Sequence, residues 1–85
     1  MQIIKVMDKN GLHARPASKV VSIAKNYQGE VFLQKGEQKC NAKSIMLIMG
    51  LDLMFGDVIE VSAIGDGSEE IELAIKVIIE SPNED

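Results

Sequence analysis

With 85 residues, 46% of them hydrophobic and 26% charged, the chain has the composition of one small folded domain, expected to span residues 1–85. A net charge of −4, two phenylalanines, one tyrosine and no tryptophan argue against direct nucleic-acid binding, since neither a basic surface nor a stacking platform is encoded. One cysteine and one histidine exclude a disulfide framework and a zinc site, and no apolar run reaches the roughly 18 residues of a membrane span. We therefore expect a soluble, cytoplasmic protein without metal or cofactor.

The first half of the chain is predicted to form a strand, a helix and a hairpin. The predicted elements are a strand at 2–7, a helix that begins at Ala14 and stops after residue 26, and strands at 30–34 and 38–42. Alternation places Ile4 and Val6 on one face of the first strand, and Lys35-Gly36-Glu37 supplies the hairpin turn. The strand at 38–42 has the weakest pattern and is expected at a sheet edge.

The second half is predicted to form a short helix opened by Ser44, a strand at 58–64 and a long amphipathic helix. The turn Asp66-Gly67-Ser68 is expected to supply the caps of that last helix, and Glu69, Glu70 and Glu72 to favour its positive end. Its apolar stripe comprises Ile71, Ala74, Ile75, Ile78 and Ile79. The order βαββαβα predicts an α+β fold, with three helices on one face of a four-stranded, mainly antiparallel sheet. The other face should meet water, with Lys5, Glu60 and Ser62 on it.

The stretch at residues 10–17, Asn-Gly-Leu-His-Ala-Arg-Pro-Ala, carries the most chemical information. His13 lies where the strand gives way to the helix, and Pro16 falls in the first helical turn, where a missing N–H is tolerated. Unbonded N–H groups and the positive helix end favour an anion at this position, phosphate included. Arg15 adds a guanidinium that can hold two phosphate oxygens at once.

An alternative is that His13 is only a surface or capping residue, which is the commoner role of a single histidine near a helix end. The sequence shows no carboxylate neighbour for His13 and no acid–base pair around it. The stretch is therefore a poor site for a self-sufficient enzyme. It is a good place to hold a phosphoryl group.

The Gly-Leu-His-Ala-Arg-Pro-Ala sequence at 11–17 resembles the active-site signature of HPr, the histidine-containing phosphocarrier of the bacterial phosphotransferase system. Lys-Ser-Ile-Met at 43–46, followed by Met49, resembles the regulatory serine region of the same family. The resemblance implies an open-faced β-sandwich and a phosphocarrier that is not itself an enzyme. It further implies that His13 accepts phosphate on Nδ1 from Enzyme I and passes it to the A domain of a sugar permease.

The same resemblance assigns roles to the neighbours of the histidine. Arg15 matches the arginine that stabilises the phosphate. Asn10 matches a residue whose side chain orders the helix start and the imidazole, while Gly11 and Pro16 match structural positions. A carrier of this kind is expected to be a monomer, because its docking surface must open to successive partners.

Ser44 has two interpretations. It is an expected N-cap, a position at which serine contributes about 1 kcal/mol. By resemblance it is also a regulatory site for HPr kinase/phosphorylase, whose product slows phosphotransfer and acts as a co-repressor with a transcriptional regulator. Phosphorylation there would add a charge of about −2 beside a docking surface.

The helix after Ser44 is unusually apolar, and a helix in so small a domain can bury only one side. Ile48 and Leu51 share a stripe and are expected in the core. The expected docking surface comprises Ile45, Met46, Leu47 and Met49, with Lys19 from the first helix. The alternative is that the helix lies deeper in the molecule.

Departures from the family pattern leave partner identity open. Leu47 replaces a residue that is often small, Lys19 one that is often apolar, and Asp52 adds a negative charge to the second helix. A carrier specialised toward regulation or nitrogen metabolism would share these features. Two other hypotheses remain: a regulatory module that acts through Ser44, and a small-molecule-binding domain, which nothing specific favours. Cys40 is expected to be a half-buried small hydrophobe, not a nucleophile.

Overall fold

A computed structural model describes residues 1–81 of the chain. The elements are β1 (Gln2–Lys5), α1 (Ala14–Asn26), β2 (Glu30–Lys35), β3 (Gln38–Asn41), α2 (Ile45–Gly50), β4 (Val58–Ile64) and α3 (Ser68–Glu80). This is the predicted order βαββαβα. The predicted bounds of the strands and of α1 differ from the observed ones by two residues at most, whereas α2 is shorter than the sequence suggested.

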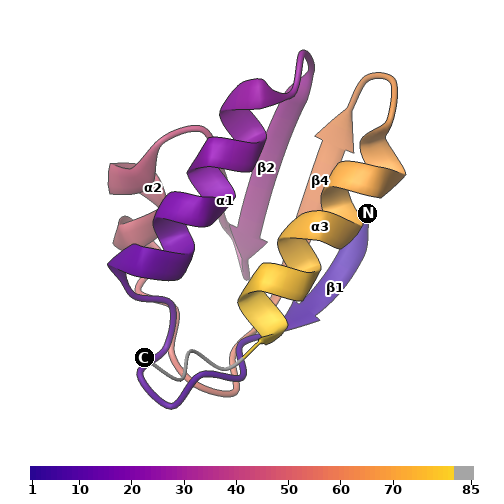
Figure 1. Cartoon of the computed structure of the whole chain (residues 1–85). Helices are drawn as coiled ribbons and strands as arrows, with labels where there is room; N and C mark the ends of the chain where they lie inside the picture. The colour runs from indigo at the N-terminus through magenta and orange to yellow at the C-terminus, as the bar shows by residue number, and fades with distance from the viewer. Residues whose placement is uncertain (82–85) are drawn as a thin grey trace.

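The four strands form one antiparallel sheet in the order β1-β4-β2-β3. The centrally placed β4 pairs with β1 through Ile59 and Ile4, and with β2 through Val61 and Leu33. β3 lies at the edge, as predicted, and joins β2 through the turn at residues 36–37. Helices α1 and α3 lie side by side across one face of the sheet (Figure 1), so the α+β prediction is confirmed. Within residues 1–81 no helix is long and apolar enough to span a membrane.

The core lies between the sheet and the helices, and it follows the periodicities of the sequence. Alternate residues of the strands point into it, and so does one stripe of each helix. The largest fully buried side chains are Ile4, Val6, Val20, Val31, Leu33, Ile48, Ile59, Val61, Ile75 and Ile79. Burial of an aliphatic side chain of this size contributes about 1.5–3 kcal/mol, so this layer is the main source of stability.

The start of α3 lies in the predicted turn at residues 66–68. Gly67, in the left-handed conformation with φ 77°, occupies the N-cap position, and no side chain caps the helix. Neither Asp66 nor Ser68 is the cap residue, because Asp66 lies one residue too early and Ser68 is already helical. Glu72 also has another role, since it is 2% exposed and its Oε2 accepts the Ala63 N–H at 2.8 Å. The pairing of β1 with β4 reaches only as far as Val61. Glu72 therefore supplies a hydrogen-bond acceptor to Ala63, a residue of β4 that β1 does not pair with.

Candidate functional site

His13 is the N-cap residue of α1, with extended backbone angles of φ −94° and ψ −175°. Its carbonyl accepts the Ala17 N–H at 3.1 Å, which begins the helix, whereas its side chain makes no capping hydrogen bond. The imidazole is 35% exposed. The capping alternative is therefore wrong for the side chain, which can be reached from solvent.

A buried carboxylate lies beside the imidazole, contrary to the sequence-based expectation. Nε2 of His13 lies 3.4 Å from Oδ2 of Asp8, and Asp8 is only 6% exposed. The turn that follows β1 brings the two residues together, because Asp8 also accepts the N–H groups of Asn10 through Oδ1 and of Gly11 through its carbonyl, both at 2.9 Å. The sequence did contain a signal for the position of Asp8. An aspartate at the start of a turn commonly accepts the backbone N–H two residues further on, which fixes its side chain within the turn.

The other predicted site residues surround the same helix start. Arg15 is exposed in the first turn, and Pro16 is half-buried at the third helical position. Asn10 takes part through its backbone N–H, the bond to Asp8 described above. The structure thus brings together a solvent-reachable imidazole, a guanidinium and the positive end of a 13-residue helix, an arrangement that attracts an oxyanion.

The loop before His13 rests on the segment between α2 and β4. Leu12 N–H donates to the Leu53 carbonyl at 3.0 Å, and Gly11 adopts φ 72° against the same carbonyl. A Cβ at Gly11 would overlap the Leu53 oxygen, so glycine is required there by both conformation and space. The position of the imidazole therefore depends on where residues 51–57 lie.

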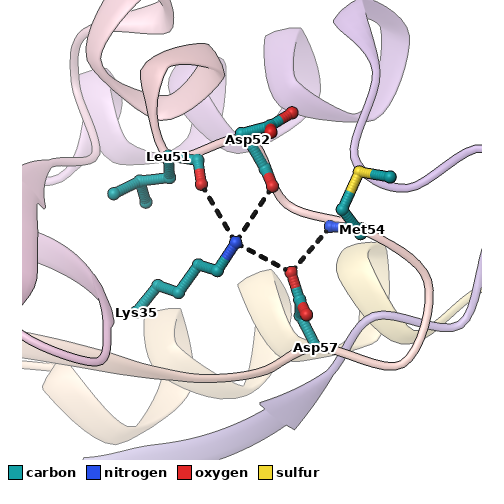
Figure 2. Close-up of polar contacts among 5 residues, drawn as sticks. All are labelled: Lys35, Leu51, Asp52, Met54 and Asp57. Atoms are coloured by element: carbon teal, nitrogen blue, oxygen red, sulfur yellow. Dashed lines mark hydrogen bonds and ion pairs between the residues drawn. The ribbon is translucent and has the colours of Figure 1, made fainter.

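Lys35 holds that segment in place. Its ammonium lies between the carbonyl oxygens of Leu51 and Asp52, at 3.4 and 3.1 Å, and Oδ2 of Asp57, at 3.0 Å (Figure 2). The Met54 N–H donates to the same Asp57 oxygen at 2.8 Å. This N–H, followed by the bond and charge of Lys35, lowers the pKa of Asp57 below its ordinary value. The segment beneath the histidine loop is thus fixed by a cation that satisfies two carbonyls at the end of α2.

The helix α2 exposes the surface that the sequence predicted. Ile48 and Leu51 are buried, whereas the outward side chains are Ile45 (36% exposed), Met46 (81%), Leu47 (51%) and Met49 (42%). The alternative of a deeper helix is therefore wrong. Met54 and Phe55, which follow the helix, are also more than half exposed. Ser44 caps the helix as expected, its Oγ accepting the Leu47 N–H at 3.3 Å.

Asp52 does not add its charge to α2, as the sequence suggested, because the helix ends at Gly50 and Leu51 is its C-cap. Asp52 follows in the left-handed conformation with φ 51°, and it is the only non-glycine residue with positive φ within residues 1–81. This conformation costs an L-residue about 1–2 kcal/mol.

Replacing Asp52 by glycine is expected to stabilise the protein by about 0.5 kcal/mol or more. The relief of left-handed strain exceeds the entropy that glycine adds to the unfolded chain. Thermal unfolding measures this as an increase in Tm of about 2–4 °C. Asp66→Gly is the matched control and should not raise Tm, because Asp66 is an exposed aspartate with negative φ. Equal changes in the two variants would contradict the interpretation.

Cys40 lies on the inward side of β3, opposite Leu33, and is 8% exposed. Burial raises the pKa of its thiol, an effect partly offset by a backbone hydrogen bond at Leu33. Since the thiolate is the reactive form, Cys40 is a packing residue and not a nucleophile. It is more deeply buried than the sequence suggested.

An open-faced sandwich with a solvent-reachable histidine at the start of its first helix has the features of the small histidine phosphocarrier domains. A family profile described as "PTS HPr component phosphorylation site" matches residues 2–81. The chain therefore belongs to the HPr family. Members of this family are phosphocarrier components of the phosphotransferase system and are not enzymes, and they act with components such as Enzyme I and sugar permease domains.

Individual relatives show the same similarity. The phosphocarrier protein HPr of Neisseria meningitidis is 39% identical over 84% of this chain and 78% of its own. The HPr-like protein Crh of Bacillus subtilis is 42% identical over 89% of this chain and 87% of its own. A crystal structure of HPr-C-His from Thermoanaerobacter tengcongensis superposes with a TM-score of 0.86 at 42% identity, covering 94% of this chain and 90% of that one. The fold is thus that of HPr proteins.

Proposed function

We propose that His13 accepts a phosphoryl group on Nδ1 from phosphorylated Enzyme I and passes it to the A domain of a sugar permease. The observation that carries this proposal is the position of the imidazole at the N-cap of α1, where it is 35% exposed and makes no capping hydrogen bond. Arg15 lies two residues further on, in the first turn of the helix. A neutral imidazole nitrogen is a competent nucleophile, and the helix start receives the transferred charge.

Each neighbour of the histidine has a role in this proposal. Arg15 holds phosphate oxygens by paired N–H bonds. Gly11 and Pro16 set the path of the chain into α1, and Asn10 closes the turn on which the imidazole rests. The site is assembled on a helix end and needs no metal or cofactor for this transfer.

The exposed apolar side chains of α2 are proposed as the docking surface for both partners. We define this surface as Ile45, Met46, Leu47 and Met49 of α2 with Lys19 of α1. The helices α1 and α2 contact one another, so this surface and the start of α1 can meet one partner together. The protein would act as a monomer, since the same surface must serve the donor and the acceptor in turn. The cytoplasmic location expected from the sequence stays a prediction.

Replacing Met46 by aspartate is expected to weaken binding to Enzyme I about tenfold or more, because an exposed anchor of an interface typically contributes over 1 kcal/mol. Met46 is 81% exposed, so the melting temperature should change little. Binding can be measured by calorimetry. Val77→Asp is the matched control, since Val77 is 64% exposed on α3, and it should leave affinity unchanged. Equal losses in the two variants would refute the docking surface.

Regulation through Ser44 is the second part of the proposal. Ser44 is half-buried and precedes Ile45 and Met46 of the docking surface. Phosphorylation by an HPr kinase/phosphorylase would place about −2 charge there, slow phosphotransfer, and create a form that a transcriptional regulator binds. In a protein that acted only as a regulatory module, Ser44→Ala would abolish function and His13→Ala would leave it intact.

The onward transfer provides the test of the carrier function. Protein phosphorylated on His13 is mixed with the isolated A domain of a sugar permease, without phosphoenolpyruvate. The phosphate should leave this protein and appear on the A domain. If the phosphate stays on His13 with every A domain tried, transfer to a sugar permease is refuted. Regulation through Ser44 then becomes the favoured function.

A further inference from the structure

The carboxylate of Asp8 has two oxygens in two fixed environments, and the proposed function gives it no role. Oδ1 accepts the Asn10 N–H at 2.9 Å, and Oδ2 faces Nε2 of His13 at 3.4 Å. The side chain is 8% exposed, so its interactions are weakly screened by water. A backbone N–H can only donate, and therefore it keeps one oxygen of residue 8 turned away from the imidazole.

We propose that Asp8 is a positioning residue that holds His13 in the tautomer with its proton on Nε2, so that Nδ1 carries the lone pair for phosphoryl transfer. This inference rests on the proposed function of His13. A carboxylate only accepts hydrogen bonds, so the ring nitrogen that faces it must be the protonated one. The second ring nitrogen of a neutral imidazole then carries the lone pair.

Asp8 also stabilises the charge that develops during transfer. The lone pair of Nδ1 forms the new N–P bond, while the bond between phosphorus and the donor nitrogen breaks and its electron pair returns to that nitrogen. The His13 ring becomes positive as the N–P bond forms, and it keeps its Nε2 proton. The carboxylate at Nε2 lowers the energy of this cationic ring, and no proton has to leave during the step.

The two oxygens make Asp8→Asn a sharper test than a deletion. The Asn10 N–H still requires an oxygen, so we expect the carboxamide introduced at position 8 to keep its oxygen on Asn10 and to turn its NH₂ group toward Nε2. Nε2 would then become the acceptor, and the proton would move to Nδ1, where the nucleophile is needed. Asp8→Ala removes the carboxylate and with it the preference that Asp8 imposes on the tautomer of the ring. If Asp8 acts by setting the tautomer of His13, phosphorylation of His13 should therefore be slower in Asp8→Asn than in Asp8→Ala.

The first measurement does not involve Enzyme I. Nitrogen-15 NMR of the neutral His13 ring distinguishes the protonated nitrogen from the other one. We expect the proton on Nε2 in the wild-type protein and in the control Asp66→Asn, and on Nδ1 in Asp8→Asn. Asp66 is the matched control because it is exposed and lines a hollow with Asn26, at the opposite end of α1 from His13. The same tautomer in the wild-type protein and in Asp8→Asn would overturn the inference.

The second measurement is the kinetics of His13 phosphorylation by Enzyme I. We expect kcat to fall about tenfold or more in Asp8→Asn, with KM little changed, since Asp8 is buried and lies outside the proposed docking surface. Asp8→Ala should lose less. The inference would be overturned if kcat fell less in Asp8→Asn than in Asp8→Ala and if the two losses followed the decreases in melting temperature. That result would show that Asp8 only supports the turn. If the wild-type protein accepts no phosphate, the proposed function fails, whereas the NMR result still decides the tautomer.

Discussion

Replacing Gly11 by alanine is expected to destabilise the protein by about 3 kcal/mol or more. The new methyl group would overlap the Leu53 carbonyl, a backbone atom that cannot rotate away, and the residue would have to hold φ 72°. The same overlap would push the histidine loop off its support, since Leu12 bonds that carbonyl at 3.0 Å. Urea unfolding with an unchanged m value measures the loss.

Gly36→Ala is the matched control for Gly11→Ala. Gly36 also has a positive φ of 59°, but a Cβ there would meet nothing within 4 Å. It should therefore cost only the left-handed strain, about 1–2 kcal/mol. Equal losses in the two variants would mean that contact with Leu53 contributes nothing.

Replacing Arg15 by alanine is expected to slow phosphoryl transfer to His13 about 100-fold, the effect typical of removing a donor that stabilises charge in the transition state. Arg15 is exposed, where the interactions of a charged side chain contribute about 0–1 kcal/mol, so the variant should remain folded. Arg15→Lys keeps the positive charge but cannot donate two parallel N–H bonds to the phosphate. Its transfer rate should therefore lie between those of the wild-type protein and Arg15→Ala. Initial rates of phosphorylation by Enzyme I provide the measurement.

Lys25→Ala is the control for Arg15, because it removes an exposed cation from the last turn of the same helix. A general effect of positive charge on the encounter with Enzyme I would slow both variants and would weaken at higher salt. A local role predicts that Lys25→Ala transfers phosphate normally. Wild-type rates in Arg15→Ala would contradict the proposed role of the guanidinium.

The fold could be predicted from the sequence because each element carries its own periodicity. Ile71, Ile75 and Ile79 recur at helical spacing and are all buried, and the alternation of Ile4 with Val6 marks the inward face of β1. Val6 lies just beyond β1 and continues its inward side. These patterns depend on neighbours a few residues apart, which the sequence displays directly. The exposed side of α2 followed from the same argument, since one face of a helix of this size must meet water.

The features that could not be predicted depend on turn geometry and on distant contacts. The approach of Asp8 to His13 requires the chain to reverse over five residues, with Gly11 at positive φ. Glu72 was assigned to the helix dipole, but it bonds a strand that precedes it by nine residues. Asp52 looked helical because it follows an apolar run, whereas Lys35 fixes its carbonyl in a left-handed turn beyond the helix. Apart from the aspartate at the start of the turn before His13, no local pattern records such partners.

Intact-mass spectrometry after incubation with phosphoenolpyruvate and Enzyme I determines whether His13 carries the phosphate. Our expectation is one added phosphate, lost in acid and absent from a folded His13→Ala variant, with Ser44→Ala modified normally. A phosphate that persists in His13→Ala would contradict it. So would an unmodified wild-type protein beside an Enzyme I that phosphorylates another HPr.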